Sequence, residues 1–205
     1  MTREEERALI DRVLDGETEQ FEKLVRANEK GVYNLALRML GNEQDALDAS
    51  QEAFFRAYRS LDRFRGGSKF SVWLYRVTSN VCLDMLRKSG RRRESSLTDE
   101  DGEDLPLPDE RSDPQRELER KETRRAVRRN LSRLEPSFRQ ALILRDVNGL
   151  TYDEIAQVTG LEPGTVKSRI FRARRKLAAL LAGDGNFFEH SSSDSTTGKG
   201  GGQDA

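Results

Sequence analysis

The chain has 205 residues, with 36 basic and 36 acidic side chains, and its hydrophobic content of 35% is low for one large core. Its one cysteine excludes a disulfide framework within the chain, and no stretch resembles a signal peptide or a membrane span. Zero net charge hides segregation, because residues 87–93 carry five positive charges whereas residues 99–113 carry eight acids and one arginine. We therefore expect a soluble, cytoplasmic protein of one or two small domains with locally basic surfaces.

Residues 1–90 are predicted to form a run of helices, since apolar side chains recur at helical spacing and no alternating strand pattern appears. Asn42 can cap one of these helices, whose first turn is acidic. A loop at residues 63–68 precedes a long helix that is predicted to end near residues 89–90. Cys82 falls on the apolar side of this helix, which favours a small buried side chain over a reactive one.

The segment from residue 61 to residue 88 mixes aromatic and basic side chains, and it is a candidate site for single-stranded nucleic acid. Aromatic rings can stack on unpaired bases while cations follow the backbone. The Gly-Gly turn of the loop allows close approach to a ligand. For Trp73 a place in the core is the better interpretation, whereas Arg65, Ser68, Lys69 and Asn80 favour function.

Residues 91–115 are polar and acidic, and they hold three of the five prolines, which predicts a flexible linker. The acidic run at residues 99–104 has no rigid geometry there, so no metal site is expected. A second helical unit begins near residue 116. Residues 184–205 are a Gly/Ser-rich, disordered tail that contains the only histidine, so histidine-based catalysis, cofactors and metal ligation are not expected.

The segment Thr151–Leu177 has the plan of a helix-turn-helix, in which the second helix lies in the DNA major groove. Thr151 and Glu154 form a capping box for the first helix. Gly160 supplies a left-handed residue at its end, and Pro163 suits the first turn of the second helix. The pattern predicts a binding site for duplex DNA.

The second helix of this segment has one apolar face, formed by residues 166, 170, 173 and 177 at helical spacing. The run from Lys167 to Lys176 contains six basic residues and no acid, so ion pairs within the helix cannot balance it. At about 100° per residue, Arg175 falls opposite the apolar face and Arg174 at its shoulder. The remaining outward residues are Lys167, Ser168, Phe171 and Arg172.

Two stretches carry a resemblance to a known family. DALDASQEAFFRAYRSLDRFRGGSKFSVWLYRVTSN, followed by LEPSFRQALILRDVNGLTYDEIAQVTGLEPGTVKSRIFRARRKL, resembles the extracytoplasmic-function sigma factors of bacterial RNA polymerase over residues 5–180. The resemblance implies an all-α fold of two small helical domains joined by a flexible linker, the second domain being a helix-turn-helix. In the numbering used for sigma factors, it implies sigma domain 2 at residues 1–90 and sigma domain 4 at residues 116–183. The linker would occupy residues 91–115, and a disordered tail would follow at residues 184–205.

The same resemblance implies a transcription initiation factor, not an enzyme, without membrane insertion. Its partners would be core RNA polymerase, promoter DNA and an anti-sigma factor. The melted −10 element would contact Phe64, Arg65, Ser68, Lys69, Phe70, Asn80 and Asp84, and the aromatic-basic pattern adds Arg76. The −35 duplex would contact Lys167, Ser168, Phe171, Arg172 and Arg174, and the outward face of the helix adds Arg175. Core polymerase would contact Asp48, Gln51 and Glu52.

Two other functions fit this pattern less well. A transcriptional regulator that acts on duplex DNA alone would use the helix-turn-helix, but it has no use for the aromatic-basic segment at residues 61–88. A nuclease or recombinase with carboxylate-bound magnesium would need acids on rigid elements beside a basic groove, and the dense acids here fall in the predicted linker.

Overall fold

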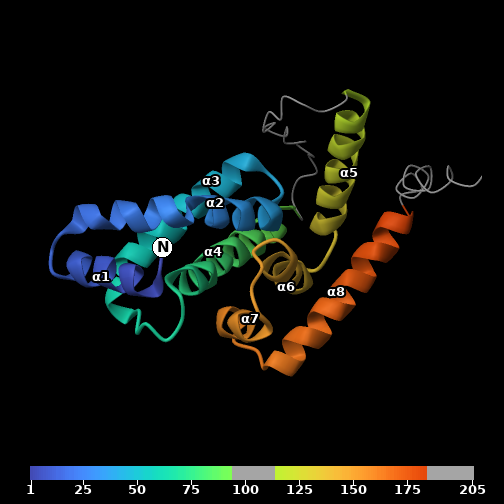
Figure 1. The fold of residues 1–205 in the computed structure, drawn as a ribbon. Coiled ribbons are helices and arrows are strands. Elements are labelled where there is room, and N and C mark those ends of the chain that lie inside the picture. Colours follow the sequence, from blue (N-terminus) through green and yellow to red (C-terminus); the bar gives the residue numbers. More distant parts are fainter. Residues whose placement is uncertain (94–113, 184–205) are drawn as a thin grey trace, which may run out of the picture.

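The computed structural model of the chain describes residues 1–93 and 114–183, and within these ranges every regular element is helical (Figure 1). This confirms the all-α prediction. Most of the predicted linker, including the acidic run at residues 99–104, and the tail with His190 lie outside the described residues. The elements are α1 (Arg3–Leu14), η1 (Thr18–Gln20), α2 (Phe21–Leu40), α3 (Glu43–Arg59), η2 (Leu61–Arg63), α4 (Phe70–Arg93), α5 (Pro114–Ser132), α6 (Pro136–Asp146), α7 (Tyr152–Thr159) and α8 (Pro163–Gly183).

Local signals in the sequence place several helix ends. The Asn42 side chain accepts a hydrogen bond of 2.7 Å from the Asp45 N–H and so caps α3, as predicted. Gly41, at φ +88°, ends α2 in the left-handed conformation that glycine adopts without strain. The predicted end of α4 near residues 89–90 was wrong, because the helix continues to Arg93. One glycine costs a helix only about 1 kcal/mol, which the following arginines, good helix formers, can offset.

The first half of the molecule, α1–α4, forms a bundle around one apolar core. Helices α2, α3 and α4 pack against one another, and α1 lies across one end of the bundle (Figure 1). Leu24, Leu35, Met39 and Leu74 are completely buried. Cys82 is also completely buried, as predicted, and burial raises its thiol pKa to about 12.

The second half, α5–α8, is smaller and folds around the helix-turn-helix. Helices α6, α7 and α8 pack against one another, and α5 packs on α8. Ile155 of α7, Val166 and Ile170 of α8 and Leu144 of α6 are nearly or completely buried. The apolar face predicted for the second helix of the motif is thus confirmed at Val166, Ile170 and Ala173, whereas Leu177 is only partly buried.

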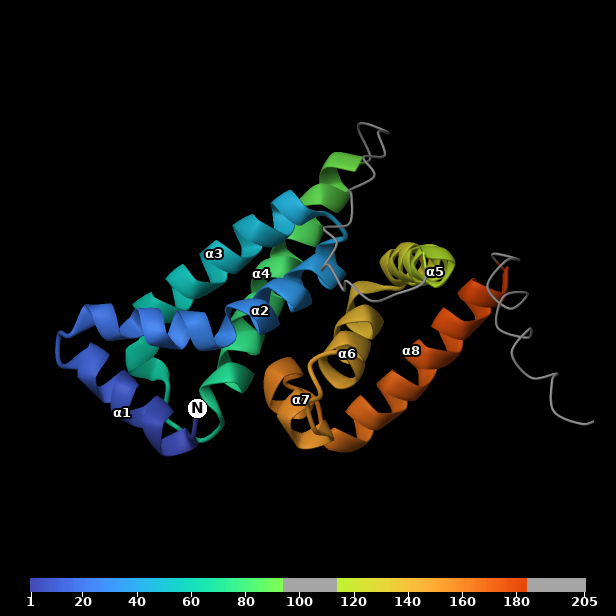
Figure 2. The ribbon, with the colours of Figure 1, turned by 45° about the horizontal axis from the view of Figure 1, so that its top comes forward.

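The two halves pack against each other instead of standing apart. Helix α7 lies against α4, and α6 lies against α2 (Figure 2). One apolar cluster runs from α1 through α4 to α6, α7 and α8. Polar contacts join the same faces: the Arg139 guanidinium donates to the Met39 carbonyl, and the Asn148 amide donates to the Gly31 carbonyl over 3.3 Å. The sequence reasoning did not predict this shared core.

Within the described ranges, no helix has both the length and the apolar character that crossing a lipid bilayer requires.

Candidate nucleic-acid interface

The helix-turn-helix forms as its sequence signals predict. The Thr151 hydroxyl accepts from the Glu154 N–H (3.2 Å), and the Glu154 carboxylate accepts from the Thr151 N–H (2.8 Å), which completes the capping box. Gly160 ends α7 at φ +73°, and α8 starts at Pro163. The Thr151 N–H, together with the nearby Lys69 ammonium, holds the pKa of Glu154 below its ordinary value.

The outward face of α8 is polar, basic and aromatic. Lys167, Ser168, Arg172 and Arg175 are exposed. Phe171 is 62% exposed, the highest value among the large apolar side chains of the described residues. The Arg175 guanidinium lies over the Phe171 ring, 6.0 Å from its centroid, so a cation and a ring form one surface. This surface can contact phosphates and base edges together.

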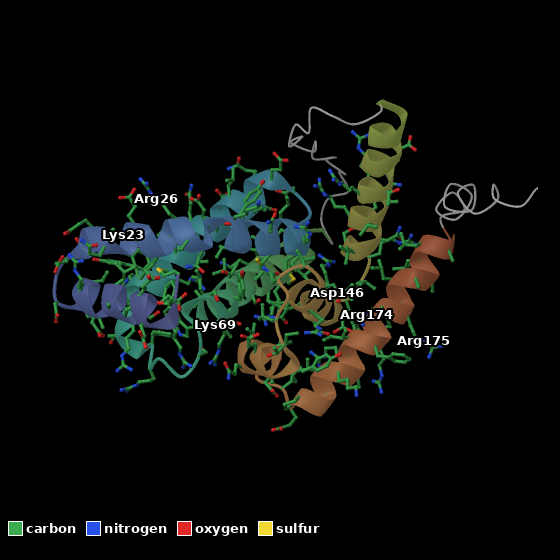
Figure 3. The ribbon with its side chains drawn as sticks, in the orientation of Figure 1. Lys23, Arg26, Lys69, Asp146, Arg174 and Arg175 are labelled. Atoms are coloured by element: carbon green, nitrogen blue, oxygen red, sulfur yellow. The ribbon has the colours of Figure 1, made fainter. Side chains whose placement is uncertain are left out.

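The structure separates Arg174 from Arg175. The Arg174 guanidinium is turned back toward the end of α6, where it forms a two-point ion pair with the Asp146 carboxylate, one contact being 3.2 Å (Figure 3). Arg175 points away from the body of the protein in the same view. Arg174 thus ties α8 to α6, whereas Arg175 belongs to the outward face with Phe171.

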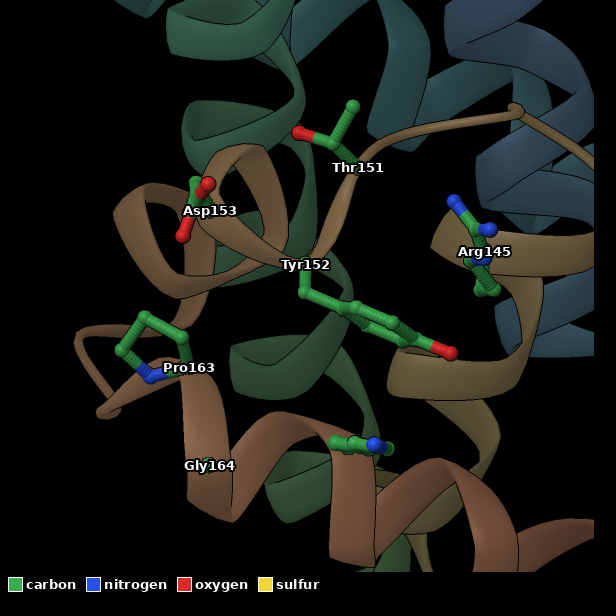
Figure 4. Close-up of a pocket in the computed structure, with 7 residues that line it drawn as sticks. Arg145, Thr151, Tyr152, Asp153, Pro163 and Gly164 are labelled. Carbon is green, nitrogen blue, oxygen red and sulfur yellow. The ribbon is translucent and has the colours of Figure 1, made fainter.

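A shallow hollow lies beside the N-terminal ends of α7 and α8, with a volume of about 490 Å³ (Figure 4). Arg145 and Lys167 contribute cations to it, and Tyr152 contributes a ring over which the Arg145 guanidinium lies at 4.8 Å. Helix N-termini carry free N–H groups and partial positive charge, which favour anions. The sequence reasoning missed Arg145, because this residue precedes the motif and joins it only through the fold.

The second candidate site surrounds the start of α4. The rings of Phe64, Phe70 and Trp73 form a triad with centroids 5.5 to 5.7 Å apart. Phe70 is completely buried, whereas Phe64 is half-buried at the edge of the triad. Phe70 therefore supports the loop from inside in this arrangement, and its predicted contact with DNA stays a prediction.

The polar residues predicted for this site lie on the loop and along one stripe of α4. Arg65 and Lys69 are exposed on the loop, and Ser68 is partly exposed beside them. Arg76, Asn80 and Asp84 follow at intervals of four along α4, so they share one side of the helix. Asp84 differs from the other two because it pairs with Arg87 at 2.7 Å and with Arg56 of α3 at 3.7 Å.

Lys69 is engaged by the other half of the molecule. Its ammonium lies 3.5 Å from the Glu154 carboxylate at the start of α7. A residue predicted to contact single-stranded DNA therefore pairs with the motif predicted to bind duplex DNA. The packing of the two halves brings the two candidate sites into contact.

A third surface lies along α3. Asp48 and Gln51 are exposed, and Glu52 is partly exposed and pairs with Arg56 at 2.6 Å. Leu47 and Phe55 are also exposed on this helix, 47% and 56% respectively. The sequence reasoning did not single them out, although apolar residues on a polar helix face are a recognisable signal. The acids and the two apolar side chains form one surface suited to a protein partner.

Comparison with protein families gives two matches in chain order. Residues 24–92 match sigma-70 region 2, and residues 124–177 match sigma-70 region 4. The chain is 40% identical over 186 residues to the RNA polymerase sigma-H factor of Pseudomonas aeruginosa, covering 88% of this chain and 96% of that protein. It is 39% identical over 176 residues to the ECF RNA polymerase sigma-E factor of Escherichia coli K12, covering 84% and 92%.

Solved structures agree with these matches. The sigma factor RpoE of Bartonella quintana, in complex with the anti-sigma factor NepR, is similar with a TM-score of 0.64, 26% identity and coverage of 80% of this chain and 98% of that one. CnrH, in complex with the cytosolic domain of CnrY, is similar with a TM-score of 0.64, 28% identity and coverage of 87% and 98%. The chain therefore belongs to the sigma-70 family, as an extracytoplasmic-function sigma factor of RNA polymerase.

Proposed function

We propose that this sigma factor carries core RNA polymerase to promoters by reading two DNA elements with two separate surfaces. One observation supports this most directly. A basic-aromatic helix face in one half of the chain and a basic-aromatic loop in the other half occur in a single polypeptide. Residues 1–90 would form domain 2, residues 91–115 the linker, residues 116–183 domain 4 and residues 184–205 a tail. The protein would act in the cytoplasm. It would open promoter DNA through binding energy, without catalysing a reaction.

The outward face of α8 is proposed to read the −35 duplex. Arg172 and Arg175 would reach base edges or phosphates, Ser168 would accept or donate a hydrogen bond, and Phe171 would contact a thymine methyl or a sugar. Lys167 and Arg145, at the hollow beside the helix N-termini, would neutralise the DNA backbone. Arg174 would act indirectly, by holding α8 against α6.

The loop before α4 is proposed to bind the melted −10 strand. Phe64 offers a ring edge for a base that has left the stack, and Arg65 and Lys69 offer charge for the phosphates. Arg76 and Asn80 continue this surface along α4, and the Asn80 amide can pair with a base edge. The α3 surface with Asp48, Gln51, Glu52, Leu47 and Phe55 would dock on core polymerase.

The packed arrangement is proposed to be a resting state that opens on the promoter. Elements named −10 and −35 are separated by about 25 base pairs, about 85 Å of B-form DNA at 3.4 Å per base pair. A compact chain of this size has a radius of gyration of only about 17 Å. The two halves must therefore separate before both elements can be bound. The related structures in complex with anti-sigma factors support a similar partner here.

Run-off transcription tests the proposal. Purified protein is added to core polymerase free of any sigma factor, with a pool of fragments from the source genome as template. Discrete transcripts that depend on the protein are expected. A regulator that acts on duplex DNA alone would bind fragments of the pool yet yield no transcript, and that result would refute the initiation function.

A further inference from the structure

Helix α1 contacts the loop before α4 at two points, although the helix and the loop are far apart in the sequence. The Glu6 carboxylate accepts a hydrogen bond of 3.1 Å from the Phe70 N–H, the first amide of α4. The Arg3 guanidinium donates a hydrogen bond of 2.6 Å to the Gly66 carbonyl, inside the loop. Gly66 has φ +69°, so this second contact fixes a peptide unit next to a left-handed residue. The loop is thus fastened at its middle and at its end.

The Glu6 carboxylate supplies a hydrogen-bond acceptor for the first amide of α4, which the loop itself does not provide. The first amides of a helix have no partner within the helix and need an acceptor from elsewhere. Ser68 stands near the position where a capping residue would act, but its hydroxyl donates to the Lys69 carbonyl. Glu6 provides the acceptor instead, and its charge interacts favourably with the positive end of α4. The start of α4, and the Phe70 ring beneath the loop, therefore depend on α1.

The two contacts line a cavity of about 360 Å³ between α1 and the loop. This volume lies within the range of sites that hold small organic ligands. Its lining includes the half-buried Phe64 ring and three arginines, Arg3, Arg7 and Arg65, together with the acids Glu4, Glu6 and Asp11. On the loop side the Phe64 ring beside Arg65 suits an unpaired base and its phosphate, whereas the acids all belong to α1.

We propose that Glu6 and Arg3 are positioning residues for single-strand capture. They hold the loop in the shape in which Phe64 and Arg65 face a base that has left the stack. This inference rests on the proposed function and deepens it. The match to sigma-70 region 2 begins at residue 24, so α1 lies outside the matched segment, and its role follows from the contacts in this chain.

A pair of variants with equal charge isolates the positioning effect. Glu6→Ala and Glu6→Gln both remove one negative charge, which by itself would strengthen binding to a polyanion. Only Glu6→Gln keeps an oxygen that can accept from the Phe70 N–H. The two variants therefore differ mainly in the hydrogen bond that holds the start of α4.

The measurement uses holoenzyme assembled from core polymerase and the full-length protein. The DNA is a promoter junction, taken from a promoter that the wild-type holoenzyme transcribes, with 2-aminopurine in its unpaired strand. Glu6→Gln, which keeps the acceptor and loses the negative charge, is expected to bind this strand at least as tightly as the wild type. Glu6→Ala is expected to bind it about tenfold more weakly, as when one charge-assisted hydrogen bond is lost, with −35 duplex affinity unchanged. Amide exchange at residues 70–73 should be faster in Glu6→Ala alone.

Three results are decisive. Equal binding of the unpaired strand by Glu6→Ala and Glu6→Gln would overturn the positioning role. A parallel loss of unpaired-strand and duplex binding in Glu6→Ala would assign Glu6 to general folding and would overturn it too. If the wild-type holoenzyme binds duplex but never the unpaired strand, the proposed −10 function fails, and the inference fails with it.

Discussion

The guanidinium of Arg139, on α6, donates a hydrogen bond to the carbonyl oxygen of Met39, near the end of α2. Its other amino group donates to the Ser132 and Leu134 carbonyls at the turn between α5 and α6. Arg139 is only 5% exposed, and desolvation lowers its pKa. One buried cation thus joins the two halves of the molecule and also shapes the turn that leads into the helix-turn-helix.

The first prediction concerns this cation. Arg139→Ala would leave three carbonyl oxygens without their donor in a buried place, so we expect a loss of about 2 to 4 kcal/mol in the free energy of unfolding. Arg139→Lys keeps the charge but cannot reach all three acceptors, so an intermediate loss is expected. Urea unfolding followed by circular dichroism measures both. A loss below about 1 kcal/mol for Arg139→Ala would show that water replaces the guanidinium.

The second prediction separates opening from unfolding. Asn148→Ala removes the hydrogen bond to the Gly31 carbonyl between the halves and touches neither candidate DNA site. Loss of about 1 kcal/mol would shift the balance between packed and open forms about fivefold. Energy transfer between dyes on Glu29→Cys and Gln157→Cys, both exposed in the wild type, should fall in the variant. The buried Cys82 would stay unlabelled.

The control for this experiment is Glu19→Ala, because Glu19 is exposed and lies far along the chain from the contact. The doubly labelled control protein should show the transfer efficiency of the doubly labelled parent. Unchanged transfer in Asn148→Ala, with unchanged unfolding, would mean that the other contacts between the halves hold them together without this hydrogen bond.

Much of the fold could be predicted from local signals. Helical spacing, Asn42, Gly41 and the capping box of Thr151 and Glu154 each act within a few residues, so the sequence displays them directly. The end of α4 could not be placed, because a glycine only weakens a helix and the flanking residues decide the balance.

The relationships between distant segments could not be predicted in this way. Nothing local in Arg139 indicates that it will be buried against Met39, which lies 100 residues away. The same holds for the contact of Glu6 with Phe70. Helical periodicity placed Arg175 on the outward face, but only the position of Asp146 explains why Arg174 turns inward.

The third prediction is a pH dependence at the start of α7. The pKa of Glu154 is lowered in the folded protein, first by the hydrogen bond from the Thr151 N–H. A lowered pKa contributes stability above the unfolded-state value of about 4.5, and that contribution is lost as the pH falls through the folded-state pKa. Glu154→Gln should therefore be less stable than the wild type at pH 7, by about 0.5 to 1 kcal/mol.

The comparison is made by urea unfolding at several values between pH 7 and pH 3. The difference between wild type and Glu154→Gln should shrink toward the acidic end, because both side chains are then neutral. A difference that stays constant over this range would assign the effect to shape instead of charge.

The fourth prediction concerns Cys82. Burial makes the thiol inaccessible and raises its pKa to about 12, so very little reactive thiolate exists at pH 8. A thiol reagent such as dithionitrobenzoate should not react with the folded protein, and it should react fully once urea unfolds the chain. Rapid labelling of the folded protein would show that α4 opens locally far more often than its packing indicates.

The last prediction distinguishes the two neighbouring arginines of α8. Arg175 points outward beside Phe171, so Arg175→Ala should weaken binding to the −35 duplex about tenfold, as expected for one lost base or phosphate contact. It should leave the free energy of unfolding unchanged. Arg174 pairs with Asp146 at the surface, where such pairs contribute less than about 1 kcal/mol, so Arg174→Ala should lower stability slightly. Its effect on duplex affinity should be the smaller of the two. Fluorescence anisotropy of a labelled duplex, measured at two salt concentrations, gives both affinities. The opposite ranking would mean that Arg174 leaves Asp146 when DNA binds.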